Sequence, residues 1–267
     1  MKKIILRFGI VILSLVFVLP VLLTLFSSFT SGALLSEIKE TVNLIPKGFS
    51  FVGYYDILIE YSWFIRGFWN SIFYALVITV INILISVPAA YAFSEAKFKG
   101  KSILYFFYIV LMMMPIQVTI LPNYIGLRDM KLMDTPFAII LPAIFAPFGV
   151  FLMCQYLSGL EKSTIEAARL ETSSVLTILI QVVAPQVRTC ILALFVFIFA
   201  ENWNMVEQPN VFLTNIKLMP LSVLLAISEN VNLVILLAGS VIFMLPIVIL
   251  YMYFHDSLEA GLESFKV

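Results

Sequence analysis

Four consecutive residues, Glu201-Asn202-Trp203-Asn204, bring a carboxylate, two amides and an indole to the end of an apolar run that begins at Cys190. Planar polar groups together with aromatic faces are the chemistry of a sugar-binding site. A carboxylate inside an apolar segment is costly and commonly marks a solute pathway or a polar partner. The other interpretation places Glu201 at a membrane interface, with Trp203 in an aromatic belt. The residues by themselves support both interpretations.

Two single amides, Asn82 and Gln117, also fall within apolar segments. They are weaker pathway candidates, since a lone amide in a membrane span more often hydrogen-bonds a neighbouring helix. The sequence has no recognisable pattern of nucleophile, base and orienting group, so a catalytic role is disfavoured. The lone His255 cannot form a metal site, and the cysteines Cys154 and Cys190 lie in apolar runs, where we expect small buried side chains rather than a disulfide. No cofactor is expected on this chain.

The amino-acid composition indicates which kind of structure holds these polar side chains. Apolar residues make up 62% of the chain and charged residues 12%, and the mean hydropathy is +1.06. A soluble domain is only about 45–50% apolar, so this is expected to be an all-α integral membrane protein. The net charge is zero and Lys and Arg do not cluster, which excludes nucleic acid as a partner.

Six apolar runs are long enough to cross the bilayer, and the 267 residues are expected to form one transmembrane domain. The expected spans are 4–26, 71–93, 103–121, 137–157, a fifth from Cys190 and a sixth at 233–254. Segment 27–70 carries interfacial aromatic residues and is expected on the outer side, on or just above the bilayer. Prolines within the spans are expected to kink helices.

Basic residues assign the sides of the membrane. Ten of the 16 Lys and Arg residues fall on the side of the amino terminus: Lys2, Lys3, Arg7, Lys97, Lys99, Lys101, Lys162, Arg169, Arg188 and Lys266. The positive-inside rule therefore predicts that both termini are cytoplasmic, including the tail 255–267. The loop 158–185 between spans four and five is predicted to be cytoplasmic as well.

This loop contains a polar stretch that predicts a short helix outside the bilayer. Ser163 stands three residues before Glu166, which predicts a capping box and a helix that begins at Thr164. The helix could rest on lipid headgroups. It could equally dock in a protein groove, because the small side chains of Ala167 and Ala168 allow close approach. The residues alone do not decide between these roles.

The same loop resembles that of ABC importer permeases, whose pattern is Glu-Ala-Ala, three residues, Gly, nine residues and Ile-x-Leu-Pro. Glu166-Ala167-Ala168 and Pro185 match this pattern at the family's spacing. Glu171 stands where the family usually has Asp, and Thr172 where it has Gly. Because glycine readily takes positive φ and Thr disfavours it, the turn at Thr172 is expected to be reshaped.

Further similarities indicate the carbohydrate-uptake branch, in particular the shorter permease of maltose-type (type I) importers. They run from Asn70 to about residue 262 in the family's order and spacing. The segments that carry them are Pro88-Ala89-Ala90-Tyr91-Ala92-Phe93, Phe98-Lys99-Gly100-Lys101, Met114-Pro115, Met133-Asp134-Thr135, Ile140-Leu141-Pro142, Trp203-Asn204 and Met219-Pro220-Leu221.

The resemblance implies a type I permease fold of six spans with a cytoplasmic coupling helix, in the cell membrane of a prokaryote. It implies four kinds of partner: a second homologous permease, two cytoplasmic ATPases that carry ATP and Mg, an extracellular solute-binding protein, and the lipid membrane. The sequence agrees, since it has no phosphate-binding Gly-x-x-x-x-Gly-Lys-Ser/Thr loop of its own. The residues implied to contact the ATPase are Glu166, Ala167, Ala168, Arg169, Glu171 and Thr172.

The function that follows is an ATP-driven, binding-protein-dependent importer permease for a sugar or oligosaccharide. One alternative is an ABC importer for another solute, such as a polyamine or a peptide, because the Glu-Ala-Ala loop is shared across solutes. A secondary transporter is a weaker alternative, since it would usually show repeat symmetry and an ion-coupling carboxylate, for which only Glu201 is a candidate.

Overall fold

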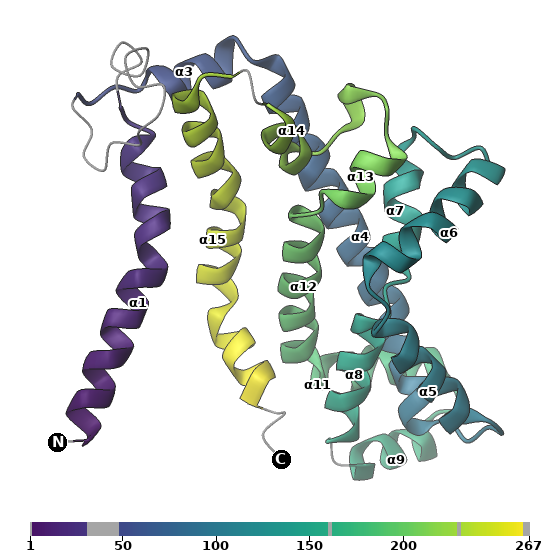
Figure 1. The fold of residues 1–267 in the computed structure, drawn as a ribbon. Helices are drawn as coiled ribbons and strands as arrows, with labels where there is room; N and C mark the ends of the chain where they lie inside the picture. The colour runs from purple at the N-terminus through teal and green to yellow at the C-terminus, as the bar shows by residue number, and fades with distance from the viewer. Residues whose placement is uncertain (1, 31–47, 160–161, 229–230, 264–267) are drawn as a thin grey trace. The chain divides into compact units, whose positions relative to one another are not determined.

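The computed structural model describes residues 2–30, 48–159, 162–228 and 231–263. This part of the chain is helical, apart from turns, loops and one isolated bridge between Thr30 and Phe49 (Figure 1). The helices are α1 Lys2–Ser27, α3 Val52–Ile59, α4 Ser62–Glu95, α5 Lys101–Met112, α6 Ile116–Asp129, α7 Pro136–Ile144, α8 Phe148–Ser158, α9 Lys162–Glu171, α10 Val175–Ile178, η1 Leu179–Val183, α11 Ala184–Gln186, α12 Arg188–Trp203, α13 Glu207–Phe212, η2 Ile216–Leu218, α14 Leu221–Ile227 and α15 Leu233–Glu263.

Two compact units make up the chain. Unit 1 comprises Met1–Trp69 and Leu221–Pro246, and unit 2 comprises Asn70–Pro220 and Ile247–Val267. The core of unit 1 is small and joins α3, the start of α4, α14 and the start of α15 around Ile57, Phe64 and Ile235. Gly53 allows α3 to approach α15, because a Cβ there would lie 2.7 Å from the Val234 side chain.

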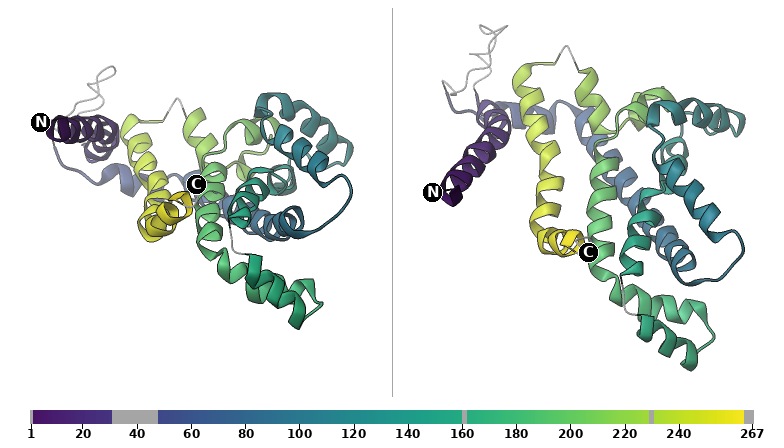
Figure 2. Two further views of the ribbon diagram at one scale, coloured as in Figure 1. Left: turned by 90° about the horizontal axis from the view of Figure 1, so that it is seen from below. Right: turned by 60° about the horizontal axis from the view of Figure 1, so that its bottom comes forward.

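Unit 2 holds the larger core, built mainly from α4, α7, α8 and α12. Tyr74, Ile139, Met153 and Leu194 are among its fully buried side chains. Within this unit α12 packs against α8, and α13 packs against α6 and α7. Helix α9, in the loop 158–185, lies at one end of the unit and α13 at the other (Figure 1). Both views in Figure 2 place α9 beside the α10–α11 segment, which it contacts.

Four helices are long and apolar enough to cross a membrane by length and composition: Leu6–Ser27, Ser62–Glu95, Pro136–Ser158 and Leu233–Glu259. Two bent pairs raise the number to six if each pair is one span. The first pair, α5 and α6, bends by 100°, where the sequence predicts one continuous span over 103–121. Pro115 explains the difference, because it lacks an N–H and disfavours helix at the preceding residue. The second pair, α10–α11 and α12, bends by 80°.

Helix boundaries differ from the expected ones at two further places. Helix α4 begins at Ser62, nine residues before the expected start of span two, so part of segment 27–70 is helical; residues 31–47 of it lie outside the described part. Helix α9 begins at Lys162, which puts Ser163 inside the helix rather than at its N-cap. The tail predicted at 255–267 continues α15 as far as Glu263, and residues 264–267 are not described. Leu258 of this tail packs on Ala193 and Val196 of α12.

Candidate functional site

A cavity of about 500 Å³ lies in unit 2 where two helical breaks meet the end of a third helix. Its walls come from the α5–α6 bend, the α7–α8 break over 145–147, and the end of α12. Glu201 and Asn202 of α12 line it. The structure therefore brings the carboxylate and one amide of the predicted cluster to a hollow surface.

Asn82 maintains the break between α7 and α8. Its side chain is 1% exposed, and its Nδ2 donates to the carbonyl oxygens of Ile144 at 3.0 Å and Ala146 at 3.1 Å. The last carbonyls of a helix have no partner within the helix, and an unpaired carbonyl inside a membrane protein is costly. The amide satisfies the carbonyl of Ile144, the last residue of α7, and that of Ala146 in the break. Asn82 does not line the cavity but supports the backbone that does.

Gly149, the second residue of α8, allows this arrangement. Ser86 Oγ donates to Asn82 Oδ1 at 3.0 Å, so both side chains are fixed against the start of α8. A Cβ added at Gly149 would overlap both Asn82 Oδ1 and Ser86 Oγ. The close approach of α4 and α8 therefore requires glycine at this position.

The predicted cluster at the end of α12 divides into separate environments. Trp203 is fully buried and stacks on Phe199, with ring centroids 5.7 Å apart, so it is not a cavity residue or an exposed belt residue. Asn204 is exposed and donates to Ala200 O of its own helix at 2.8 Å. Asn202 lies at the cavity, although its Nδ2 donates to Ile198 O at 2.8 Å. Only Glu201 and Asn202 of the four line the cavity.

Gln117 lies outside the cavity lining, where it joins α6 to α13. Its Nε2 donates to both carboxylate oxygens of Glu207, at 3.1 and 3.3 Å. Three polar residues that the sequence analysis did not select do line the cavity: Thr119, Asn123 and Gln208. Asn123 was missed because it occurs beyond the expected end of span three. The bend at Pro115 turns this part of α6 toward α12. In the sequence, the Met114-Pro115 pair was the feature that could have indicated this bend.

Helix α9 has an inner and an outer face. Ile165 and Ala168 are 1% and 8% exposed and belong to the core of unit 2. Glu166, Ala167 and Glu171 are exposed, and Leu170 is 91% exposed. The two alanines of the Glu-Ala-Ala pattern therefore point in different directions: Ala168 allows α9 to pack closely on its own chain, while Ala167 belongs to the outer surface.

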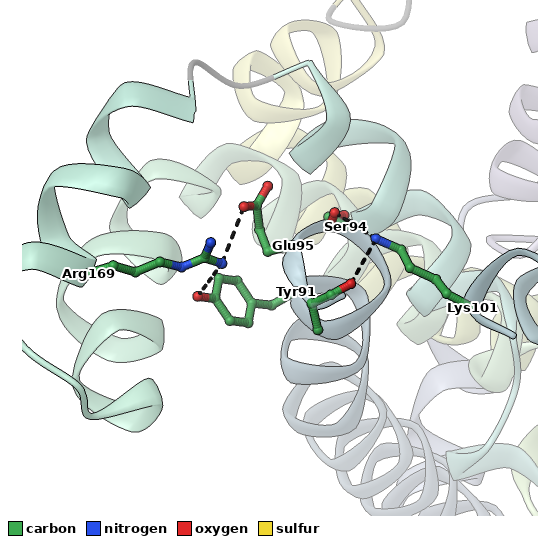
Figure 3. A network of polar contacts seen from close by, with 6 residues as sticks. Tyr91, Ser94, Glu95, Lys101 and Arg169 are labelled. Atoms are coloured by element: carbon green, nitrogen blue, oxygen red, sulfur yellow. Dashed lines mark hydrogen bonds and ion pairs between the residues drawn. The ribbon is translucent and has the colours of Figure 1, made fainter. Parts of the chain in front are cut away.

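Arg169 ties α9 to the end of α4 (Figure 3). Its Nη2 donates to Tyr91 Oη at 3.1 Å and lies 3.3 Å from Glu95 Oε2. The hydrogen bond to Tyr91, together with the carboxylates of Glu95 and Glu166, raises the pKa of Arg169 above its ordinary value. The guanidinium is thus held on α4 by charge-assisted contacts. On the other side of this helix end, Lys101 Nζ donates to the carbonyl oxygens of Ser94, near the end of α4, and Ala96, just beyond it (Figure 3).

The turn at Thr172 does not use a positive φ. Among the described non-glycine residues only Lys131 and Asp134 have positive φ. Thr172 Oγ1 instead accepts from Ser174 N at 3.2 Å, and Ser174 Oγ accepts from Thr177 N at 3.3 Å as the N-cap of α10. Two short side-chain turns replace the glycine expected from the resemblance.

At the other end of unit 2, Asp134 connects the α6–α7 loop to the segment after α13. Its Oδ1 accepts from Thr214 N at 2.9 Å and from Asn215 N at 2.7 Å, while its own N donates to Phe212 O at 3.0 Å. The backbone hydrogen bonds from Asn215 and Thr214 lower the pKa of Asp134 below its ordinary value of 3.8. The residue has φ 60°, which Asp tolerates better than most residues.

Comparisons with known proteins agree with this architecture. Residues 82–264 match the family model described as "Binding-protein-dependent transport system inner membrane component". The arabinooligosaccharides transport system permease protein AraQ of Halalkalibacterium halodurans is 30% identical over 96% of this chain and 93% of its own length. AraQ of Bacillus subtilis is 27% identical over 94% of this chain and 90% of its own.

A shorter match and a solved structure extend the comparison. The sn-glycerol-3-phosphate transport system permease protein UgpE of Brucella abortus is 29% identical over 54% of this chain and 51% of its own length. A crystal structure of a bacterial ABC transporter involved in the import of the acidic polysaccharide alginate has a chain with the same fold, with a TM-score of 0.83 at 24% identity, over 96% of this chain and 95% of that one. These relatives are transport components and not enzymes. The chain therefore belongs to the family of binding-protein-dependent transport system inner membrane components, the permease subunits of ABC importers.

Proposed function

We propose that this chain is the permease of a saccharide importer, and that it converts movement of an ATPase at α9 into opening and closing of the cavity at Glu201. The observation that carries the proposal is the two-faced helix α9. Its exposed side offers Glu166, Ala167 and Leu170 to a partner, while Arg169 fastens it to α4. Helix α4 in turn holds the cavity wall through Asn82.

The membrane arrangement in this proposal has six spans, with each bent pair crossing once. Both termini and α9 are cytoplasmic, as the distribution of Lys and Arg predicts. The α6–α7 loop and α13 then face outward, because they lie at the end of unit 2 opposite α9 (Figure 1).

The partners in the proposal are a second homologous permease, two cytoplasmic ATPases and an extracellular solute-binding protein. ATP and Mg bind to the ATPases, and this chain binds no cofactor. ATPase closure moves α9 as a rigid body, since Ile165 and Ala168 pack it into the core and Arg169 pairs with α4. The bend at Val187 separates this moving segment from α12, which carries Glu201.

The relatives support a saccharide as the solute. Two are named for arabinooligosaccharides, and the structural relative for alginate. UgpE is named for sn-glycerol-3-phosphate. These solutes share hydroxyl groups but differ in charge. The relatives therefore support a polyhydroxylated solute for this chain and do not indicate whether it is charged.

Two substitutions on opposite faces of α9 test the coupling role. In the assembled importer, Glu166→Ala is expected to weaken association with the ATPases, because the residue belongs to the exposed face. Arg169→Ala should leave that association intact but lower saccharide uptake per ATP hydrolysed several-fold, because it removes the link to Tyr91 and Glu95. Arg169→Lys should retain part of the coupling, since lysine keeps the charge but not the planar fork.

The matched control is Arg128→Ala, which removes an exposed pair with the adjacent Asp129. This control should change neither quantity. Equal uptake per ATP in the wild type and in Arg169→Ala would refute the coupling path, and absence of ATP-dependent uptake by the wild-type complex would refute the importer function.

A further inference from the structure

The charge of the cavity lining, among the described residues, comes from one carboxylate. Among the described residues that line it, Glu201 is the single ionisable side chain, and Lys, Arg and His are absent. Glu201 is exposed, and no described residue forms a hydrogen bond or an ion pair with its carboxylate. Its negative charge is therefore not neutralised by a neighbour in the described part of the chain.

The remaining polar groups of the cavity suit hydroxyl groups. The side-chain amides of Asn123 and Gln208 line the cavity and make no hydrogen bond to another described residue, so both can donate and accept. Phe145 and Phe148 add aromatic faces from the α7–α8 break. An uncharged, polyhydroxylated molecule can pair with the amides and with the carboxylate, which accepts hydrogen bonds from hydroxyl groups.

An anionic molecule meets a different environment. Its charge would lie within a few ångströms of Glu201, with no cation in the described lining to offset the repulsion. At that separation in a partly hydrated cavity, two like charges change an equilibrium or a rate by roughly ten- to a hundredfold.

We propose that the cavity admits uncharged saccharides and that the Glu201 carboxylate excludes anionic ones, such as uronates and sugar phosphates. The inference rests on the proposed importer function and names the charge class of its solute. It assigns to Glu201 a role in specificity that does not depend on ATP hydrolysis.

Charged thiol reagents can measure the electrostatic effect of the Glu201 carboxylate on the cavity. The sample is the complete importer in membrane vesicles. The starting chain carries Cys154→Ala and Cys190→Ala, which remove the two buried thiols, and Thr119→Cys, which places a reporter thiol in the cavity wall. The reporter thiolate displaces methanesulfinate from a methanethiosulfonate and forms a mixed disulfide. The measured quantity is the ratio of modification rates by the cationic trimethylammonioethyl reagent and the anionic sulfonatoethyl reagent.

Glu201→Gln is expected to lower this cation-to-anion ratio about tenfold at the cavity reporter, through loss of one unit charge. Glu201→Asp keeps the charge and should preserve the ratio. A control reporter introduced by Ser102→Cys instead of Thr119→Cys lies at an exposed position at the start of α5, outside the cavity lining. Its ratio should not change with Glu201→Gln.

The outcomes separate the two proposals. An unchanged ratio at the cavity reporter in Glu201→Gln, or modification by neither reagent, overturns the charge selection whatever the transport activity. A tenfold fall confined to the cavity reporter supports it. Failure of the importer function would appear independently, as absence of ATP-dependent saccharide uptake in vesicles that carry the wild-type chain.

Discussion

Asn82→Ala tests whether one buried amide supports the broken wall of the cavity. The substitution removes two hydrogen bonds, to Ile144 O at 3.0 Å and Ala146 O at 3.1 Å. A hydrogen bond between helices in a membrane averages about 0.6 kcal/mol and reaches about 1.7 kcal/mol. Leaving a buried carbonyl unpaired costs about 1–3 kcal/mol. Because Asn82 is 1% exposed and water cannot readily replace it, we expect a loss of about 2–4 kcal/mol in the free energy of unfolding.

The assay is reversible unfolding in mixed micelles, with the fluorescence of buried Trp203 as one probe. Asn204→Ala is the matched control, since this exposed amide bonds only a carbonyl of its own helix. It should change the free energy of unfolding by less than about 0.5 kcal/mol. Equal stability of the two variants would refute the idea that Asn82 supports the break.

Gly149 provides an independent check on the same geometry. Gly149→Ala alone should cost about 1–3 kcal/mol, because its Cβ overlaps Asn82 Oδ1 and Ser86 Oγ. In the Asn82→Ala, Ser86→Ala background the overlapping atoms are gone, so the same substitution should cost much less. The coupling energy from this cycle is expected to be about 1–3 kcal/mol. Additive effects would mean that the close contact does not limit the packing of α4 on α8.

Two further predictions concern the loops at the ends of unit 2. Thr172→Gly should destabilise the α9–α10 turn by about 1 kcal/mol, since it removes the oxygen that accepts from Ser174 N and adds backbone freedom. Amide hydrogen exchange over residues 172–178 should therefore become faster. The control Thr172→Ser keeps the hydroxyl group, so its exchange rates should remain near those of the wild type. Asp134→Asn should quicken exchange at Thr214 and Asn215 at neutral pH, whereas Asp129→Asn should not. The folded-state pKa of Asp134 lies below its ordinary 3.8, so its stabilising effect is present above that pH and is lost as the pH falls through the lowered value. After correction for intrinsic rates, the exchange rates of these amides in the wild type should rise on acidification. Rates that do not rise would contradict this role of Asp134.

Composition was sufficient for the class of protein, and the resemblance of its motifs to those of ABC importer permeases indicated the family. An excess of apolar residues requires helices that satisfy their own backbone in lipid, and this follows from the sequence without any tertiary contact. The polar stretch around Glu166 likewise predicted a short helix between the fourth and fifth apolar runs, and α9 occupies that place. The predicted start at Thr164 was wrong by two residues, since α9 begins at Lys162 and Ser163 lies inside the helix.

Residues close in sequence were harder to assign, because burial depends on which face meets another element. Glu201 and Trp203 are two residues apart, yet one lines the cavity and the other is fully buried. Ala167 and Ala168 are adjacent and separate into an outer and an inner residue. Arg169 carries the charge expected of a residue that contacts the ATPase. Within this chain it pairs with Glu95, which lies 74 positions earlier in the sequence.

The sequence by itself determined that this is a helical membrane protein with a polar helix between its fourth and fifth apolar runs, since hydropathy and spacing along one helix are local properties. Its motifs, through their resemblance to ABC importer permeases, indicated the family. Only the tertiary structure decided where the cavity lies and which side chains face it. The bend at Pro115 and the break supported by Asn82 let α6, α7, α12 and α13 meet, so that Asn123, Glu201 and Gln208 share one surface. Those contacts join residues far apart in the chain, and no periodicity within a single helix encodes them.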